Sequence, residues 1–254
     1  MGRKISIIGS GNVATNLAHA FDRAGHDILQ VISANSERAK QLANCFGAYY
    51  GNSISSVDLN ADFIIICVND ESYFNVLEEL PKGLKPIICH TSGPVSMDVI
   101  SDYAPNFGVF YPLQSLRKEK YIDFLDVPIF IEGNSTNVRE NLMNLADTIS
   151  NKISEVSSVE REKYHLAAVF ANNFTNLMYT LSHKYLEDES LDFQNLIPII
   201  KETANRLADD KPESWQTGPA KRGDTAIMQK HIDMLEDPRL KEIYKQLSDY
   251  IRSN

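Results

Sequence analysis

ISIIGSGNVATNLAHAFDRAG, residues 5–25, combines a β-branched run, a glycine-rich turn and an amphipathic helical pattern in direct succession. Residues 5–8 predict a short strand, and apolar side chains then recur at helical spacing from residue 12 to residue 23. Gly25 predicts the end of that helix. A strand that passes through glycines into a helix begins a βαβ unit, so this stretch predicts an α/β fold.

The same alternation continues as far as residue 156. The run at 63–68 is apolar throughout, which is typical of a parallel strand covered on both faces. We predict a Rossmann fold, a doubly wound parallel sheet with right-handed crossovers. The predicted strands are residues 5–8, 28–32, 62–68, 86–89, 107–110, 128–131 and 152–156, and the predicted helices are 12–23, 36–46, 71–80, 97–103 and 136–150.

The pattern changes after residue 156, beyond which the sequence shows no strand signal. Residues 159–186 predict one long helix, and three shorter helices are predicted at 193–208, 225–235 and 238–251. We therefore predict a Rossmann domain over residues 1–156 and an all-helical domain over residues 157–254. The helices of the second domain are apolar enough that we expect a homodimer.

Composition excludes several classes of partner. The 254 residues carry a formal charge of −9, and the longest basic run is Arg117-Lys118, so we expect no nucleic-acid partner. Cys45, Cys67 and Cys89 match no metal-binding spacing, and we expect neither a metal site nor a disulfide. The most apolar run is too short to cross a bilayer and the amino terminus lacks a signal-peptide pattern, so we expect a cytoplasmic protein.

The turn itself matches the pattern G-x-G-x-x-A. In a strand–turn–helix context, the first glycine permits the tight turn, the second lets a pyrophosphate approach the backbone, and the alanine lets the helix pack on the strand. Free N–H groups at the helix start favour phosphate binding. The alternative is an ordinary strand-to-helix turn. The expected cofactor contacts here are Gly9, Ser10, Gly11, Asn12, Val13 and Ala14.

The segment after the second predicted strand distinguishes NADP from NAD. A carboxylate at the strand end would bind the ribose 2′-hydroxyl of NAD, and none stands there. Glu37 would complicate this interpretation if the helix began earlier than predicted. We expect NADP, with NAD as the alternative. The expected contacts of the 2′-phosphate are Ser33, Asn35, Ser36 and Arg38.

Polar residues follow three predicted strands, at the sheet edge where open parallel sheets bind ligands. We expect Val68, Asn69 and Thr91 to contact the cofactor. His90 and Ser92 are candidate catalytic residues, and a structural role for His90 is the alternative. Gln114, in the segment after residue 110, is a candidate for substrate binding.

The predicted long helix carries a polar stripe of His165, Asn172, Asn176 and His183, with Asn173 beside it. Buried amides and imidazoles need partners or a ligand. We take His165, Asn172 and Asn173 as candidate catalytic residues, with His165 as a general acid or base. The alternative is a set of hydrogen-bonded core or interface residues.

Residues 217–224, TGPAKRGD, predict a turn-rich loop before a helix. Asp224 is placed to cap that helix, and Arg222 is a candidate for holding an anionic group of the substrate. We include both among the candidate substrate-binding residues, with a purely structural role as the alternative.

Taken together, the motifs at residues 9–14, 90–93, 111–115, 164–173 and 217–224 resemble a bacterial family of oxidoreductases. Its members join a Rossmann-like domain to a helical domain of unknown function. The wider superfamily includes pyrroline-5-carboxylate reductases, β-hydroxyacid dehydrogenases and deazaflavin-dependent NADP oxidoreductases, and the helical domain resembles the C-terminal domain of 6-phosphogluconate dehydrogenase. The resemblance implies NADP binding, dimerisation through the helical domain and an active site in the cleft between domains.

One feature of β-hydroxyacid dehydrogenases is missing. Their first long helix carries a Lys followed four residues later by Asn, whereas Lys163 is followed by Ala167. The function we predict is NADP-dependent hydride transfer to or from a small carbonyl or imine. The alternative is a non-catalytic NAD(P)-binding sensor or scaffold.

Overall fold

The computed structural model describes residues 2–253, which form two compact units. The first unit ends at Met178 and the second begins at Tyr179. The greater part of the long helix thus belongs to the first unit, although the strands end earlier, at Glu155. The domain boundary at residue 156 stays a prediction.

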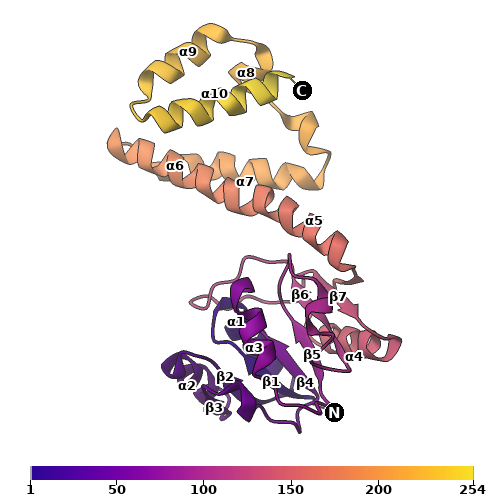
Figure 1. The fold of residues 1–254 in the computed structure, drawn as a ribbon. Coiled ribbons are helices and arrows are strands. Elements are labelled where there is room, and N and C mark those ends of the chain that lie inside the picture. Colours follow the sequence, from indigo (N-terminus) through magenta and orange to yellow (C-terminus); the bar gives the residue numbers. More distant parts are fainter. Residues whose placement is uncertain (1, 254) are drawn as a thin grey trace. The chain divides into compact units, whose positions relative to one another are not determined.

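The first unit contains an eight-stranded sheet of order β3-β2-β1-β4-β5-β6-β7-β8 (Figure 1). The chain crosses from one side of β1 to the other when it passes from β3 to β4, which creates the switch point at which such sheets bind ligands. The strands are β1 (Lys4–Ile8), β2 (Asp27–Ile32), β3 (Tyr49–Gly51), β4 (Phe63–Ile66), β5 (Ile87–His90), β6 (Phe107–Pro112), β7 (Ile129–Gly133) and β8 (Ile153–Glu155).

The predicted Rossmann-like sheet is confirmed, with one difference in strand direction. Every neighbouring pair is parallel except β6 and β7, which are antiparallel. A parallel pair needs a crossover, usually a helix, whereas residues 113–128 form no helix between these strands. The chain therefore re-enters the sheet from the edge at which β6 ends.

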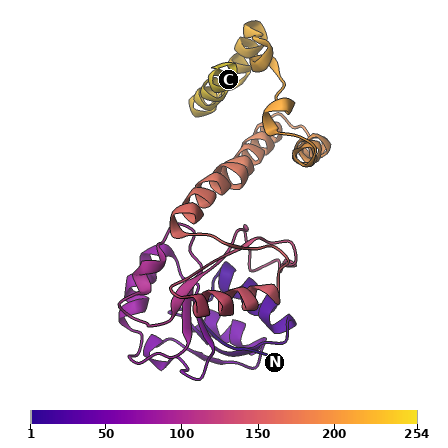
Figure 2. The ribbon, with the colours of Figure 1, turned by 90° about the vertical axis from the view of Figure 1, so that its right-hand side faces the viewer.

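Helices cover both faces of the sheet (Figures 1 and 2). In β4, Phe63 and Ile65 face one buried cluster while Ile64 and Ile66 face another, as the two-residue period of a strand requires. The first cluster packs against α1 (Asn12–Arg23), α2 (Ser36–Asn44) and α4 (Thr136–Asp147), and the second packs against α3 (Tyr73–Glu78) and the 3₁₀ helix η3 (Met97–Ile100). Burial on both faces explains the unbroken apolar run of β4.

The long helix predicted over residues 159–186 is present but not uniform. It comprises α5 (Ser158–Ala168), the π-helical turn η4 (Val169–Phe174) and α6 (Thr175–Asp188). A π turn closes i→i+5 hydrogen bonds and so rotates the residues after it relative to an α-helix. The three-residue strand β3 escaped prediction, and the predicted helix at 97–103 is the shorter η3.

The described residues of the second unit form helices joined by short loops and contain no strand. A short helix, α8, lies inside the segment predicted as a loop at 217–224. No helix among residues 2–253 is long and apolar enough to span a membrane. After α6 the elements are η5 (Phe193–Leu196), α7 (Ile197–Asn205), η6 (Arg206–Ala208), η7 (Pro212–Trp215), α8 (Pro219–Arg222), α9 (Thr225–Met234) and α10 (Pro238–Ser253); two further 3₁₀ turns, η1 (Ile54–Ser56) and η2 (Asp70–Ser72), belong to the first unit.

Candidate active site

Glycine stands at the two positions of the turn between β1 and α1 for different reasons. Gly9 has a φ of +126°, and a Cβ there would lie 2.2 Å from the carbonyl oxygen of Cys67, so the fold itself requires glycine. Gly11 has a φ of −88°, and a Cβ there would meet nothing within 4 Å. The fold would therefore accept a side chain at Gly11, and the space above it is open to a ligand.

Gly11 is also the N-cap of α1, and no side chain caps this helix. The N–H groups of the first turn consequently lack the intrahelical partners that later residues have. Such a helix start attracts anions, because the N–H groups and the helix dipole both favour negative charge. Ala14 is fully buried against the sheet, as its small size permits.

A cleft of about 620 Å³ lies above this turn, at the carboxyl ends of β1, β2 and β4. Of the expected cofactor contacts, Asn12, Val13, Ala14, Ser36 and Thr91 do not line it. The expected residues that do line it are Gly9, Ser10, Gly11, Ser33, Asn35, Arg38, Val68 and Asn69.

Sequence reasoning missed a second group of cleft residues, among them Asn52, Ile54, Ser72, Asn75 and Glu79. The first two follow β3, a strand without a sequence signal, so nothing pointed to them. The last three lie on or beside α3, whose exposed polar positions were a usable signal. Glu79 places one carboxylate at the cleft wall.

The end of β2 provides hydrogen-bonding groups and one cation. The Ser10 hydroxyl donates to the Ser33 hydroxyl at 2.8 Å, and the Asn35 side chain accepts from the Arg38 N–H at 3.0 Å as the N-cap of α2. Glu37 does not line the cleft, and its carboxylate accepts from the Gln41 amide instead, at 3.2 Å. Arg38 is thus the charged group of this segment that faces the cleft.

The loops after β4 and β5 are tied together beside this cleft. Asn69 lines the cleft, and its neighbour Asp70 accepts a 2.6 Å hydrogen bond from the Ser92 hydroxyl. That hydroxyl also accepts from the Val95 N–H at 3.2 Å. Thr91 lies below the loop surface and donates to the Ile66 carbonyl at 3.3 Å. Ser92 therefore joins two loops, and its hydroxyl already has partners on both sides.

His90 lies in the core below this loop. Its side chain is 0% exposed, its Nδ1 accepts from the Ser92 N–H at 3.2 Å, and its Nε2 has no partner among the described residues. Burial, reinforced by the positive charge of Arg161, lowers the pKa of His90 to about 3. A catalytic role for His90 stays a prediction, and its burial favours the structural alternative, because an enclosed imidazole is poorly placed to exchange protons with a ligand.

Arg161, near the start of α5, is buried and anchors the helix to the β5 loop. Its Nε donates to the carbonyl oxygens of Ser92 and Gly93 at 3.2 and 3.1 Å, and a terminal nitrogen pairs with Glu132 at 2.8 Å. No sequence pattern predicts this role, since Glu132 lies on β7 and Arg161 belongs to a charged stretch. The anchor places the next turn of α5 over Gly93.

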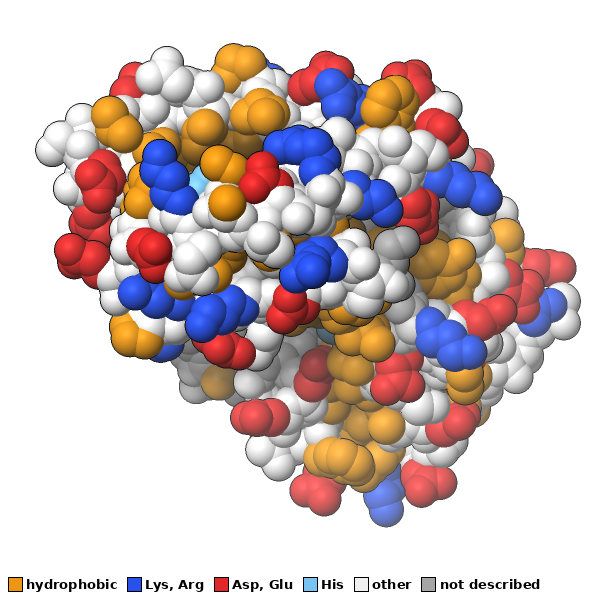
Figure 3. Space-filling view, turned by 90° about the horizontal axis from the view of Figure 1, so that it is seen from above, with side chains coloured by type: hydrophobic (Ala, Val, Ile, Leu, Met, Phe, Trp, Pro, Cys, Tyr) orange, Lys and Arg blue, Asp and Glu red, His pale blue; other side chains and the backbone are white. Residues whose placement is uncertain are grey.

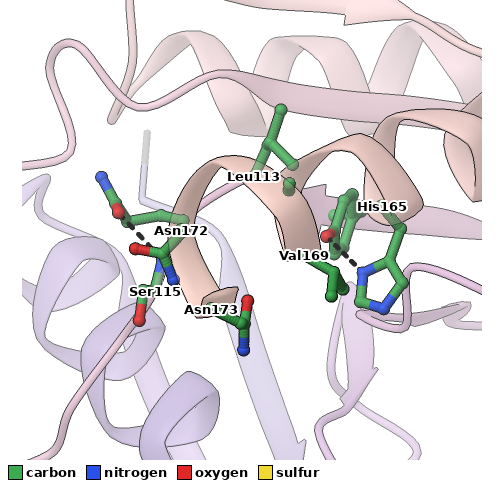
Figure 4. A pocket seen from close by; sticks show the side chains of 9 residues that line it. Leu113, Ser115, His165, Val169, Asn172 and Asn173 are labelled. Atoms are coloured by element: carbon green, nitrogen blue, oxygen red, sulfur yellow. Dashed lines mark hydrogen bonds between the residues drawn. The ribbon is translucent and has the colours of Figure 1, made fainter. Parts of the chain in front are cut away.

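A second, smaller pocket of about 270 Å³ lies between the end of β6 and this helix (Figure 4). All of its lining residues belong to the first unit. The predicted catalytic residues His165, Asn172 and Asn173 meet here, together with the predicted Gln114. The remaining lining residues are Tyr111, Leu113, Ser115, Ala168 and Val169.

His165 is held between two neighbours. Its Nδ1 lies 3.1 Å from the hydroxyl oxygen of Tyr111, which belongs to the motif at residues 111–115, although only Gln114 of that motif was named as a site residue. A Cβ at Gly93 would lie 2.5 Å from the same nitrogen, so only glycine fits there. Burial raises the pKa of Tyr111, with a smaller increase from Asp70 that opposes a decrease from Arg161.

The π turn explains why Asn172 and Asn173 both line this pocket. In an α-helix, adjacent residues point about 100° apart, since there are about 3.6 residues per turn. The wider turn at Val169–Phe174 brings Asn173 round toward the face that carries His165. Such π turns are frequently found at functional sites.

The other candidates lie elsewhere. His183 belongs to the second unit, where its ring lies 4.0 Å from the Glu187 carboxylate. Asp224 caps α9 by accepting from the Ile227 N–H at 3.1 Å, as predicted. Arg222 is the last residue of α8. For Arg222 and Asp224, contact with a substrate stays a prediction.

Two families match the chain in succession. Residues 4–88 match the family described as NADP oxidoreductase, coenzyme F420-dependent. Residues 127–251 match a domain of unknown function, DUF2520. Among curated proteins, the glutamyl-tRNA reductase of Sulfolobus acidocaldarius is 29% identical over 108 residues, and this match covers 39% of our chain but only 26% of that protein.

Solved structures extend the likeness to the whole chain. A Bacteroides fragilis protein, provisionally described as an NADP oxidoreductase, is 37% identical, with coverage of 100% of this chain and 99% of that one and a TM-score of 0.95. The 1-pyrroline-5-carboxylate reductase of Streptococcus pyogenes is 15% identical, with coverage of 100% and 99% and a TM-score of 0.67. A reductive aminase from Aspergillus terreus, solved with NADPH and ethyl-5-oxohexanoate, is 13% identical, with coverage of 100% and 93% and a TM-score of 0.73.

The two reductases show likeness of fold alone, because their identities are low. The Bacteroides fragilis protein shows more, because its identity to our chain extends over nearly the full length of both. Its description agrees with the amino-terminal match and with the glycine turn described above. The chain therefore belongs to a family of NADP oxidoreductases in which a Rossmann domain is joined to a DUF2520 domain.

Proposed function

We propose that this oxidoreductase transfers hydride between NADP(H) and a small carbonyl or imine substrate held in the pocket at His165. One observation carries the proposal, namely a short path of contacts from the cofactor cleft to that pocket. Asn69 lines the cleft, Asp70 is bonded to Ser92, and Gly93 lies directly against His165. A nicotinamide at Asn69 would thus lie near an ionisable group in an adjoining pocket.

The cleft residues fit the phosphates of NADP. The bare backbone at Gly11 and the uncapped start of α1 suit a pyrophosphate. Ser33 and Arg38 supply a hydroxyl and a cation for the 2′-phosphate, with no carboxylate at the end of β2 to repel it. When bound, NADPH supplies the hydride, and the protein orients the reactants and handles protons.

The smaller pocket suits a neutral, polar substrate. None of its nine lining residues is Lys, Arg, Asp or Glu. Asn172, Asn173 and Gln114 offer amide groups that can hold a carbonyl or imine by hydrogen bonds. His165 would give a proton to the reacting oxygen or nitrogen during reduction, or take one during oxidation.

A pair of histidine variants tests the catalytic assignment. We expect His165→Asn to lower kcat by about 10²–10⁴-fold in assays that follow NADPH absorbance over ketones and cyclic imines. His183→Asn is the matched control, because His183 belongs to the same predicted stripe yet lies in the second unit. Equal activity in both variants would remove His165 from the mechanism.

Cofactor binding is tested separately, by titrating the purified protein with NADPH and NADH. We expect tighter binding of NADPH, and NADH binding of equal strength would contradict the assignment of the 2′-phosphate site. If NADPH binds but no compound of the panel is turned over, the alternative of a non-catalytic sensor or scaffold is favoured.

We also infer that the chain forms a homodimer. Ile199 on α7 is 63% exposed and Leu247 on α10 is 51% exposed, and Figure 3 shows hydrophobic side chains among charged ones on the face that it views. Exposed apolar surface of this kind favours association. Analytical ultracentrifugation should give twice the 28.6 kDa of one chain, and a 28.6 kDa species alone would contradict the inference. We expect the dimer to act in the cytoplasm, and cell fractionation tests this.

A further inference from the structure

The two ring nitrogens of His165 have different surroundings. Nδ1 lies 3.1 Å from the Tyr111 hydroxyl oxygen. Nε2 has no hydrogen-bond partner among the described residues, and solvent can reach it. We propose that Tyr111 is a positioning residue that donates its proton to Nδ1 of neutral His165, so that Nε2 carries the ring proton and presents it to the substrate. The proposal rests on the proposed function and deepens it.

Geometry restricts the ring to this arrangement. Tyr111 lies next to the end of β6 and is paired with β7, whereas His165 lies on α5, which Arg161 anchors to the β5 loop. Gly93 fills the space beside Nδ1, where a Cβ would come within 2.5 Å. A flipped ring would lose the Tyr111 contact. Nδ1 therefore faces protein and Nε2 is the nitrogen available to a ligand.

The direction of the hydrogen bond follows from counting acceptors. A phenol carries one proton, and Tyr111 is half-buried, so its hydroxyl gains from an acceptor within the protein. Among the described residues, Nδ1 of His165 is the acceptor that the Tyr111 hydroxyl reaches. Because burial raises the pKa of Tyr111, the hydroxyl stays protonated and able to donate. An imidazole that accepts at Nδ1 keeps its own proton on Nε2.

The resulting proton path balances. Once the substrate carbon has gained hydride, the former double-bond pair resides on oxygen or nitrogen, and that atom takes the proton of Nε2. Nδ1 takes the proton of the Tyr111 hydroxyl, and the phenolate then regains a proton from water. A phenol is intrinsically a stronger acid than an alcohol, so an alkoxide product can draw the proton along this path, although burial of Tyr111 makes its phenolate harder to form.

Nuclear magnetic resonance of the cofactor-free protein tests the tautomer directly. The chain has six histidines, and His165→Asn identifies the signals of His165 in two-bond ¹H–¹⁵N spectra recorded under alkaline conditions. We expect protonated Nε2 in at least about tenfold excess over protonated Nδ1. Tyr111→Phe should shift the ring toward a mixture of tautomers. Tyr164→Phe, at an exposed position beside His165 on the same helix, should leave the signals unchanged.

Protonated Nδ1 in the unsubstituted protein would overturn the proposal, and so would identical His165 signals in Tyr111→Phe. The tautomer found in the unsubstituted protein tests the proposal even if Tyr111→Phe does not fold. In NADPH assays, Tyr111→Phe should lower kcat about tenfold or more while KM stays within about threefold. An unaffected kcat in Tyr111→Phe together with a large loss in His165→Asn would reject this inference and leave the proposed function standing. An unaffected His165→Asn would reject the function itself.

Discussion

The cofactor cleft and the pocket at His165 are built in different ways. The turn of the cleft is made by neighbours in sequence, since Gly9, Gly11 and the start of α1 lie within a few residues. The pocket joins the end of β6 to α5 and η4, and its central contact, Tyr111 to His165, spans 54 positions. Local sequence therefore determines the first region, whereas the second exists only once the chain has folded.

The difference predicts that the two regions respond differently to substitution. A change in the glycine turn acts on its immediate surroundings, either on backbone geometry or on the bound phosphate. A change at the pocket can act from a distance, because the position of His165 depends on Arg161 and Glu132, which touch no ligand in our proposal. Four predictions, given in order of decreasing effect, sharpen this comparison.

The largest effect is expected from Arg161→Met. The guanidinium is 1% exposed, and its loss leaves the Glu132 carboxylate and the carbonyls of Ser92 and Gly93 without their donor. Removing one partner of a buried pair costs about 3–5 kcal/mol. Urea denaturation measures the loss. The control is Arg139→Met, which breaks the more exposed pair with Glu155 and should cost less than about 1 kcal/mol. Similar losses in both variants would show that the anchor does not hold the helix.

The two glycines of the cleft should separate stability from binding. Gly9→Ala forces a side chain into a φ of +126° and against the Cys67 carbonyl, which should cost about 2–3 kcal/mol of stability. Gly11→Ala should change stability by less than about 0.5 kcal/mol but weaken NADPH binding about tenfold or more. Denaturation and NADPH titration of both variants check this. Full NADPH affinity in Gly11→Ala would place the pyrophosphate elsewhere.

His90 lies beneath the loop that joins the cleft to the pocket, and it makes the stability of the folded protein depend on pH. Its pKa is about 3 in the folded protein, against about 6.5 in an unfolded chain. The unfolded state therefore binds a proton that the folded state excludes, and stability is lost as pH falls below about 6.5 toward 3. His90→Gln should flatten this slope by about 1.4 kcal/mol per pH unit. Unfolding measured at several pH values tests this, and parallel curves would contradict it.

The sequence predicted the elements that depend on residues close together in the chain, and it did not predict the contacts that form only in the folded protein. The strand, turn and helix at residues 4–23 appear where their pattern placed them, because burial periodicity and glycine act locally. Asn172 and Asn173 were selected as part of a polar stripe, but the π turn that turns both toward one pocket has no known signature in the sequence.

Longer-range features were beyond the sequence for a physical reason. No pattern links Arg161 to Glu132 or Tyr111 to His165, since each pair meets only through tertiary packing. His90 was selected because it follows a strand toward the ligand-binding edge, yet the side-chain period of β5 turns it into the core. The position of His90 in the chain correctly predicted the edge of the sheet at which it lies, but not the direction in which its side chain points.

The smallest effect is expected from Arg38→Ala. This variant tests whether residues near the turn in sequence also determine the choice between NADP and NAD. Arg38 is exposed on the first turn of α2 and faces the cleft, so its attraction for a 2′-phosphate is weakened by solvent. We expect NADPH affinity to fall by about 1 kcal/mol, a factor of about five, with NADH affinity unchanged. The control is Arg23→Ala at the far end of α1, which should alter neither affinity. Equal losses for NADPH and NADH would mean that Arg38 acts on a part common to both nucleotides, and the preference for NADP would then have to come from Ser33 and the backbone.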